Sequence, residues 1–349
     1  MWQQIAECAS APEVAFCLPW FSGGTFAIYW YGILASVGIF VGAFYAARHV
    51  EMEGGDPDIV WDALLWVLIA GLVGGRLWYV AAEVLGGSTA YSLSDPLGII
   101  NPRGGGMNIF GGAAGGFIAV LIYSRVRKMD GWLLSDAGLL GLLLGQGIGR
   151  FGNLINQELY GPPTGSDWFG MLVREENRLR QFQGLPAETR FHPTMLYEAA
   201  WLFLTFGILF YIFRRYQPRI VHGIMTGAYL VMAGFGRFII EFWRPDQPTI
   251  TLSGGLEVSI SRLLSMLYVV VGLIVLLDRT GNLKIPFIKR PQNRRQREQA
   301  YQDILAQRRR QQRHAERERQ REQRRRQRER ARKEREAPGG QAGTEESPE

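Results

Sequence analysis

The chain has 349 residues and a formal net charge of +7, with a mean hydropathy of −0.04 that is ordinary for a soluble protein. The net charge and the mean hydropathy both average over two parts of the chain that differ in composition. Residues 289–349 carry a net charge of +9, whereas residues 1–288 carry −2 and contain apolar runs of about 20 residues, the length of a bilayer-spanning helix. These runs exclude a soluble globular class for the body.

The segment before the first apolar run has no basic region of the signal-peptide kind, so we predict no cleavable signal peptide. Both cysteines of the chain, Cys8 and Cys17, lie there. They allow either a disulfide in an oxidising compartment or two unpaired thiols, and they are too few for a cysteine-rich zinc site. We predict no metal site and no cofactor.

Seven apolar segments predict an all-α polytopic membrane protein with seven transmembrane helices, periplasmic loop elements and a charged cytoplasmic tail. The predicted spans are residues 26–48, 59–83, 110–127, 132–155, 195–213, 222–243 and 260–278. The predicted domains are a periplasmic N-terminal segment at 1–25, a seven-helix transmembrane domain at 26–280, and an Arg-rich, partly helical or disordered tail at 281–349.

Lysine and arginine near the span ends predict the orientation, because such residues favour the cytoplasmic side. They gather after the first, third and fifth spans, around Arg48, at 125–128 and at 214–219, and again in the tail. We therefore expect the amino terminus outside and the carboxyl terminus in the cytoplasm. In a bacterial inner membrane, the outside is the periplasm.

With this orientation, polar residues of six spans fall at one depth near the outer face. They are Tyr31, Arg76, Asn108, Arg150, Asn153, Asn156, Glu198, Arg237, Glu241 and Arg244. An arginine at a helix centre costs about 2.5–3.5 kcal/mol on insertion scales, so arginines are tolerable there if they face carboxylates and a wet cavity. Because the planar guanidinium group can bind phosphate with two hydrogen bonds, the arginines at this depth predict a site for the phosphate of a phospholipid.

Structural roles are the alternative for several of these residues. The arginines could be internal struts, and for Arg244 we favour a side chain that extends to the headgroups. His192, which precedes a proline, and Asp136, expected near a helix start, are interpreted as structural. The glycine clusters at 104–106 and 111–116 favour close helix packing over phosphate binding.

The stretch GRFGNLINQELYG, residues 149–161, resembles the signature of the prolipoprotein diacylglyceryl transferase family. Four other stretches are similar to family segments in the same order: YWYG at 29–32, GGRLWYV at 74–80, HPTMLYE at 192–198 and GRFIIEFWRPD at 236–246. The resemblance covers about residues 20–280 and leaves out the tail. It implies seven spans, which would form the catalytic domain, and an active face directed outward.

The resemblance also implies a reaction, the transfer of a diacylglyceryl group from phosphatidylglycerol to the lipobox cysteine of a preprolipoprotein. The products would be a thioether and glycerol phosphate. Two positions depart from the family: Phe110 stands where a proposed catalytic histidine is expected, and Ala233 replaces a tyrosine. The general base therefore cannot be carried over.

Site residues follow from the motifs and from the depth argument. As catalytic residues we predict Arg150, Arg237, Glu158 and Glu241, and as substrate-binding residues Tyr31, Arg76, Asn153, Asn156, Gly161, Glu198 and Arg244. Arginines would bind the phosphate, amides would orient the headgroup or the backbone, and carboxylates would hold the arginines or accept the thiol proton. The expected partners are phosphatidylglycerol, lipobox peptides and the bilayer.

The basic tail, 294–336, has no Gly or Pro and repeats Glu–Arg pairs at i, i+4, which favours a solvated helix. Attraction to an anionic lipid surface is the second interpretation, and we expect no nucleic-acid partner. Two other functions remain open for the body: an outward-facing anion or lipid transporter, and a lipoprotein-binding homologue without catalysis. We find no internal repeat of the transporter kind.

Overall fold

The computed structural model describes residues 11–19, 25–85, 106–217, 219–244, 249–251, 257–285 and 294–336. The helices are α2 (Trp30–Met52), α3 (Asp58–Leu85), α5 (Ile109–Val126), α6 (Gly131–Asn156), α7 (Thr194–Tyr216), α8 (Ile224–Ile240), α9 (Ile260–Arg279) and α10 (Arg294–Glu336). The chain divides into two compact units, Met1–Arg294 and Arg295–Glu349, and α10 belongs almost entirely to the second.

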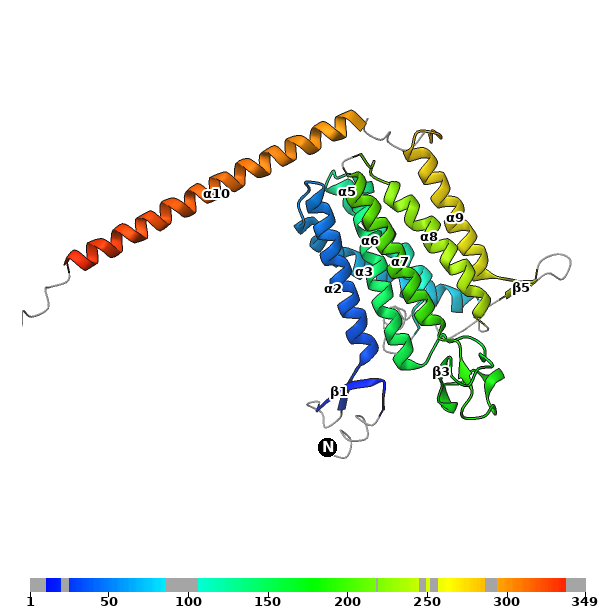
Figure 1. Ribbon diagram of the computed structural model, residues 1–349. Coiled ribbons are helices and arrows are strands. Elements are labelled where there is room, and N and C mark those ends of the chain that lie inside the picture. The colour runs from blue at the N-terminus through cyan, green and yellow to red at the C-terminus, as the bar shows by residue number, and fades with distance from the viewer. Residues whose placement is uncertain are drawn as a thin grey trace, which may run out of the picture. The chain divides into compact units, whose positions relative to one another are not determined.

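Six helices of the described chain are long and apolar enough to cross a membrane, which makes the protein polytopic. They are α2, α3, α6, α7, α9, and α8 continued by the 3-10 turn η4 (Glu241–Trp243). The third predicted span corresponds to α5, whose apolar stretch, Gly111–Val126, is shorter. Neighbouring contacts order the helices α2, α6, α7, α8 and α9, which run side by side in Figure 1.

Three short antiparallel strand pairs accompany the helices, and an all-α prediction does not contain them. The pairs are β1 (Val14–Pro19) with β2 (Thr25–Tyr29), β3 (Met171–Leu172) with β4 (Arg190–Phe191), and β5 (Thr249–Thr251) with β6 (Glu257–Ser259). The labelled β1 and β3 lie at the same end of the bundle (Figure 1). Two 3-10 turns, η2 (Glu175–Asn177) and η3 (Arg180–Phe182), lie between β3 and β4.

The first span begins later than predicted, at Trp30 instead of residue 26. Residues 25–29 pair with β1, so their backbone groups are satisfied by a strand before the helix starts. The pairing also crosses the predicted boundary between the N-terminal segment and the transmembrane domain. Cys17 lies in β1 and is disulfide-bonded, whereas Cys8, the other cysteine of the sequence, lies outside the described residues.

Glycines bring the helix pairs α2–α6 and α3–α5 into close contact, as expected for membrane helices that pack through small residues. In the α2–α6 pair, a Cβ at Gly42 would lie 2.6 Å from the Gly141 carbonyl oxygen. In the α3–α5 pair, a Cβ at Gly111 would lie 2.3 Å from the Gly74 carbonyl oxygen. This confirms the packing role predicted for the glycines at 111–116, and of the cluster at 104–106 only Gly106 is described.

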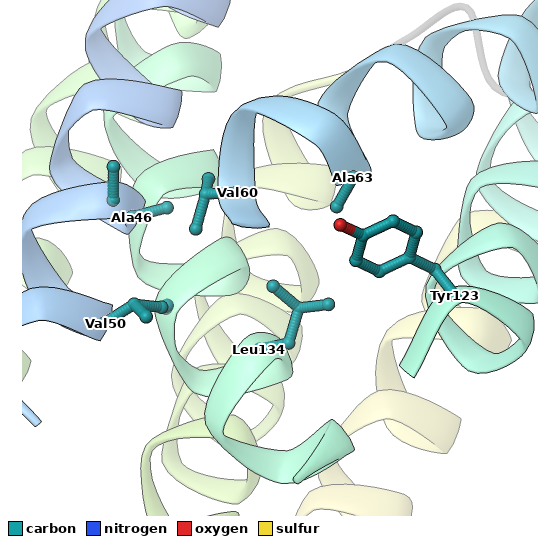
Figure 2. Close-up of a cluster of buried hydrophobic side chains, with 8 residues drawn as sticks. Ala46, Val50, Val60, Ala63, Tyr123 and Leu134 are labelled. Atoms are coloured by element: carbon teal, nitrogen blue, oxygen red, sulfur yellow. The ribbon is translucent and has the colours of Figure 1, made fainter. Parts of the chain in front are cut away.

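Apolar side chains fill the spaces between these backbones. Figure 2 shows one cluster, to which α2, α3, α5 and α6 contribute Ala46, Val50, Val60, Ala63, Tyr123 and Leu134. A second cluster joins α6 to α7 and α8 through Leu140, Leu143, Leu209, Phe213, Met225 and Tyr229. The helices that carry the candidate site are therefore fixed to one another by a buried apolar core.

The helix-start role predicted for Asp136 is wrong. Asp130 is the N-cap of α6, and its side chain accepts from the Trp132 amide. Asp136 is 2% exposed and instead accepts from the amides of Gly223 and Thr226, each at 2.7 Å. The carboxylate of one helix thus satisfies free N–H groups at the start of another, α8.

Candidate functional site

The stretch 149–161 ends α6 and turns back on it. Gln157 is in the left-handed conformation, with φ 55° and ψ 40°, and Leu159 also has a positive φ. The Glu158 amide donates to the Asn153 carbonyl at 3.0 Å, which closes the helix end. The turn places the carboxylate of Glu158 beside the last turn of α6 instead of further along the chain.

Three arginines meet one carboxylate, that of Glu198 in the first turns of α7. Arg150 of α6 reaches its Oε2 at 2.5 Å, and Arg237 of α8 reaches its Oε1 at 2.5 Å. Arg244, just after η4, reaches Oε1 at 3.4 Å. The prediction that Arg150 and Arg237 lie together is confirmed, because both pair with the same side chain.

The side chain of Arg244 is 6% exposed, so the expectation that it extends to the headgroups is wrong. A buried carboxylate is costly unless charged partners compensate its lost hydration, and Arg244 supplies one of three such partners for Glu198. Arg244 closes the cluster from the buried side.

A second carboxylate extends the cluster. Glu241, in η4 and with a side chain 0% exposed, pairs with Arg237 Nη2 at 3.1 Å, as its i, i+4 spacing predicted. Its other oxygen accepts from Ser259 Oγ at 2.5 Å. Arg237 therefore bridges two carboxylates through its two terminal nitrogens, a geometry that suits a guanidinium and not an ammonium.

Three arginines and two carboxylates make up this ion-pair cluster: Arg150, Arg237, Arg244, Glu198 and Glu241. The two carboxylates are buried, whereas the side chains of Arg150 and Arg237 remain 27% and 30% exposed. Both arginines retain N–H donors beyond those used in the cluster, because a guanidinium carries five. The cluster can therefore bind one further anion from the exposed side of these two arginines.

An amide chain connects the ion-pair cluster to Glu158. Arg150 donates to Asn153 Oδ1 at 3.3 Å, and Asn153 donates in turn to Glu158 Oε1 at 2.7 Å. Asn156 donates to the same oxygen at 3.3 Å. Asn153 thus contacts the part-exposed Arg150, and Glu158 and Asn156 are connected to it through Asn153.

Tyr31 and Gly161, two further predicted site residues, make packing contacts with α6 and with the segment that follows it. The Tyr31 ring covers Gly152 of α6, where a Cβ would come within 2.6 Å of its Cδ2. A Cβ at Gly161 would lie 2.7 Å from the Trp243 carbonyl oxygen and 2.9 Å from the His192 Cβ. Gly161 therefore lets the segment after α6 approach the turn that carries Glu241.

Arg76 has a different environment from the other predicted arginines. It is 5% exposed in α3, donates to the Gly106 carbonyl at 3.0 Å, and lies 5.7 Å from the centroid of the Tyr79 ring. It is not one of the three arginines that pair with Glu198. Phe110, at the position of the family's proposed catalytic histidine, lies outside the residues whose side chains are described.

Two features of the site carry no signal in the sequence. Ser259, the partner of Glu241, directly precedes α9, and a serine before a helix reads as an ordinary N-cap. Arg174 pairs with Glu13 at 3.3 Å and so ties the segment after α6 to the β1–β2 hairpin. His192 has the structural environment expected of it, with Nδ1 3.0 Å from the Tyr197 hydroxyl.

Comparison with known proteins agrees with the motifs. A family model described as prolipoprotein diacylglyceryl transferase matches residues 19–277. A phosphatidylglycerol–prolipoprotein diacylglyceryl transferase of Chloroflexus aggregans is 34% identical over 263 residues, 71% of this chain and 84% of the relative. Proteins of the same name from Enterococcus faecalis and Corynebacterium diphtheriae are 31% and 32% identical over 272 and 267 residues, covering 77% and 74% of this chain and 92% and 90% of theirs.

Proposed function

The chain belongs to the prolipoprotein diacylglyceryl transferase family, and we propose that it transfers the diacylglyceryl group of phosphatidylglycerol to the lipobox cysteine of a preprolipoprotein. The observation that carries this proposal is the shared pairing of Arg150, Arg237 and Arg244 with Glu198. It places the part-exposed guanidinium groups of Arg150 and Arg237 side by side with N–H donors still available, which suits the phosphate of a lipid headgroup.

The reaction is a substitution at the glycerol carbon that bears the phosphate ester. The cysteine sulfur forms a bond to this carbon while the bond from carbon to phosphate oxygen breaks, and glycerol phosphate leaves with the electron pair. The nucleophile is the thiolate, and a free cysteine has a pKa of about 8.5, so nearby arginines favour its formation. They also stabilise the charge that develops on the departing phosphate.

The residue roles follow from this geometry. Arg150 and Arg237 bind the phosphate, with Glu198 and Glu241 fixing their direction. Glu158, which is exposed and held by two amides, accepts the thiol proton. The other predicted substrate-binding residues would orient the substrates or shape the site: Tyr31, Arg76, Asn153, Asn156, Gly161 and Arg244.

For the membrane arrangement we propose seven spans, with α5 as the seventh, in a bacterial inner membrane. The family match extends across α5, and its apolar stretch is short but continuous. An outside amino terminus is supported by the disulfide of Cys17, since disulfides persist in oxidising compartments such as the periplasm. The carboxyl terminus and the basic tail would then face the cytoplasm, where anionic lipid is the partner we propose.

The test is a reaction with purified components. The protein, phosphatidylglycerol and a lipobox peptide are incubated, and the peptide is examined by mass for the thioether-linked diacylglyceryl group. A transporter or a non-catalytic homologue would leave the peptide unmodified. Arg150→Ala and Arg237→Ala are each expected to abolish transfer while the protein still inserts, and near-normal transfer by either variant would remove that residue from the mechanism.

A further inference from the structure

A pocket lies between the start of the first span and the end of α6, and hydrogen bonds through Glu158 and Asn153 connect its Asn156 to Arg150 of the ion-pair cluster. Its volume is about 460 Å³, and it is lined by Ala27, Ile28, Tyr29, Tyr31, Gly32 and Asn156. Five of these residues come from β2 and the first turn of α2, whereas Asn156 is the last residue of α6. The lining is therefore mostly apolar, with one amide at its α6 side.

The amide of Asn156 is only half satisfied. Its Nδ2 donates to Glu158, but its Oδ1 is buried and has no hydrogen-bond partner. A buried acceptor without a partner destabilises the protein, so a ligand that brings an N–H or O–H donor to it is stabilised there. An acyl chain offers no such donor, whereas every peptide N–H does.

The strand that borders the pocket can receive an extended peptide. Among the described strands, β2 pairs with β1 alone, so its second edge is not used by that pairing. Main-chain hydrogen bonds to such an edge, with side chains in adjacent pockets, are a recurrent mode of peptide binding. The Arg174–Glu13 ion pair holds the hairpin against the segment after α6, which keeps this edge in place.

Hydrogen bonds connect the pocket to the residues proposed to take part in the reaction. Asn156 and Asn153 donate to the same oxygen of Glu158, and Asn153 accepts from Arg150. A peptide seated at Asn156 therefore lies next to the proposed proton acceptor, Glu158, which is connected through Asn153 by two hydrogen bonds to a phosphate-binding arginine. The lipid phosphate is already accounted for by the arginines, which leaves the pocket for the other substrate.

We propose that this pocket binds the apolar peptide segment next to the reacting cysteine, in an extended conformation along β2, with a peptide N–H donated to Asn156. The proposal rests on the proposed function and specifies its protein substrate site. It predicts that altering the pocket changes the affinity for the peptide and leaves the affinity for phosphatidylglycerol unchanged.

Gly32 allows a sharp test, because a Cβ built there meets no atom within 4 Å. Gly32→Leu adds volume at the pocket without a backbone clash. Gly207→Leu is the matched control: Gly207 lies in α7, does not line the pocket, and its Cβ also meets nothing within 4 Å. Ile28→Ala, which removes apolar surface from the lining without adding volume, is the second pocket variant.

Binding is measured in the absence of phosphatidylglycerol, with a fluorescent lipobox peptide whose cysteine is replaced by serine so that it cannot react. We expect Gly32→Leu and Ile28→Ala to raise the peptide Kd about tenfold, equivalent to about 1.4 kcal/mol, and Gly207→Leu to leave it unchanged. In the transfer assay, the same two variants should raise the KM for peptide and not the KM for phosphatidylglycerol.

Other results would overturn the proposal. An increase in the KM for phosphatidylglycerol alone would make the pocket a lipid site, and an unchanged peptide Kd in both pocket variants would show that no peptide binds there. The wild-type protein separates this outcome from a failure of the proposed function: if it binds the peptide but forms no thioether, the pocket assignment stands and the catalytic assignment fails.

Discussion

Glu198 is the residue on which the candidate site depends. It is 6% exposed, and its two oxygens take ion pairs from three arginines of different segments. Removing the charge of a buried ion-pair partner is costlier than removing an exposed one, because the remaining charges stay buried without compensation. In this cluster the three guanidinium groups would lose the negative charge that they share and would repel one another.

We expect Glu198→Gln to lower the free energy of unfolding by about 3 kcal/mol and to reduce transfer at least a hundredfold, because a buried charge partner is lost. Thermal unfolding in detergent and the thioether assay measure the two effects. Glu176→Gln is the control: Glu176 also pairs with an arginine, Arg174, but its side chain is 69% exposed, so the change should stay below about 1 kcal/mol. Equal effects from both variants would contradict the central role of Glu198.

Arginine geometry gives a second prediction at this scale. Arg237 donates a hydrogen bond from Nη1 to Glu198 and forms an ion pair at 3.1 Å from Nη2 to Glu241, two contacts that a lysine ammonium cannot make with the same planar geometry. Arg237→Lys should therefore keep the charge and still lose most of the transfer activity, with the KM for phosphatidylglycerol raised. Activity close to that of the wild type would show that charge alone suffices at this position.

At the scale of elements, glycine contacts set how closely the helices approach. Gly141 and Gly138 are one turn apart in α6, but only Gly141 faces α2, where a Cβ would lie 2.3 Å from the Gly42 carbonyl oxygen. At Gly138 a Cβ would meet no atom within 4 Å. Alanine at a helical glycine is intrinsically favourable by up to about 1 kcal/mol, so the two sites should respond with opposite signs.

We expect Gly138→Ala to leave the unfolding temperature equal or slightly higher, and Gly141→Ala to lower it, because α2 must move away from α6. The displacement would also move Tyr31 from its position over Gly152, so transfer should fall in the second variant only. Differential scanning fluorimetry and the thioether assay report both. A stabilised Gly141→Ala protein would show that α2 and α6 do not pack as closely as described.

The α5–α6 connection supplies a pH-dependent contact. Burial raises the pKa of Asp130, but the hydrogen bond and charge of His222, the Trp132 amide and the charge of Arg279 outweigh it, so this pKa lies below its usual value. A lowered pKa in the folded state stabilises the protein above the unfolded pKa of about 3.9, and the contribution disappears as the pH falls through the folded value.

Asp130→Asn should therefore lower the unfolding temperature at pH 5 to 7, and the difference from the wild type should shrink as the pH approaches 3. Asparagine is also a good N-cap, so the substitution removes the charge and keeps the cap of α6. The measurement is the unfolding temperature of both proteins across this range. A difference that grows towards low pH would have the wrong sign for the proposed contact.

The elements and the site were not equally predictable from the sequence. Long apolar runs fixed six spans to within a few residues, and the requirement that arginines meet carboxylates brought Arg150 and Arg237 together before any contact was known. The start of the first span was missed because strand pairing with β1, a non-local contact, decides residues 25–29. Glu198 was predicted as one of the carboxylates that hold the arginines, but the convergence of three arginines on it was not, since spacing along one helix pointed only to Glu241.

At the scale of the whole molecule, the family match and the basic tail are separate. The match covers residues 19–277, whereas α10 begins at Arg294 and lies almost entirely in the second compact unit. Along α10, arginines recur every three or four residues at 310, 313, 317, 321, 324, 328, 332 and 335, which places them on one face of a helix. This arginine face presents a row of positive charges along the helix, which suits a surface of anionic groups.

We expect the tail to bind anionic lipid and to be dispensable for the chemistry. Each basic residue near an anionic surface contributes about 1 kcal/mol, and this attraction is screened by salt. Truncation after residue 293 should therefore leave the kcat for lipobox peptide unchanged and abolish salt-sensitive adhesion of protein-containing nanodiscs to anionic vesicles.

Replacing the eight face arginines by glutamine in the full chain should match the truncation, because it removes the charge row and keeps good helix formers. If those substitutions left vesicle adhesion intact, the arginine face would not be the lipid-binding element; if truncation abolished transfer, the tail would belong to the catalytic machinery after all.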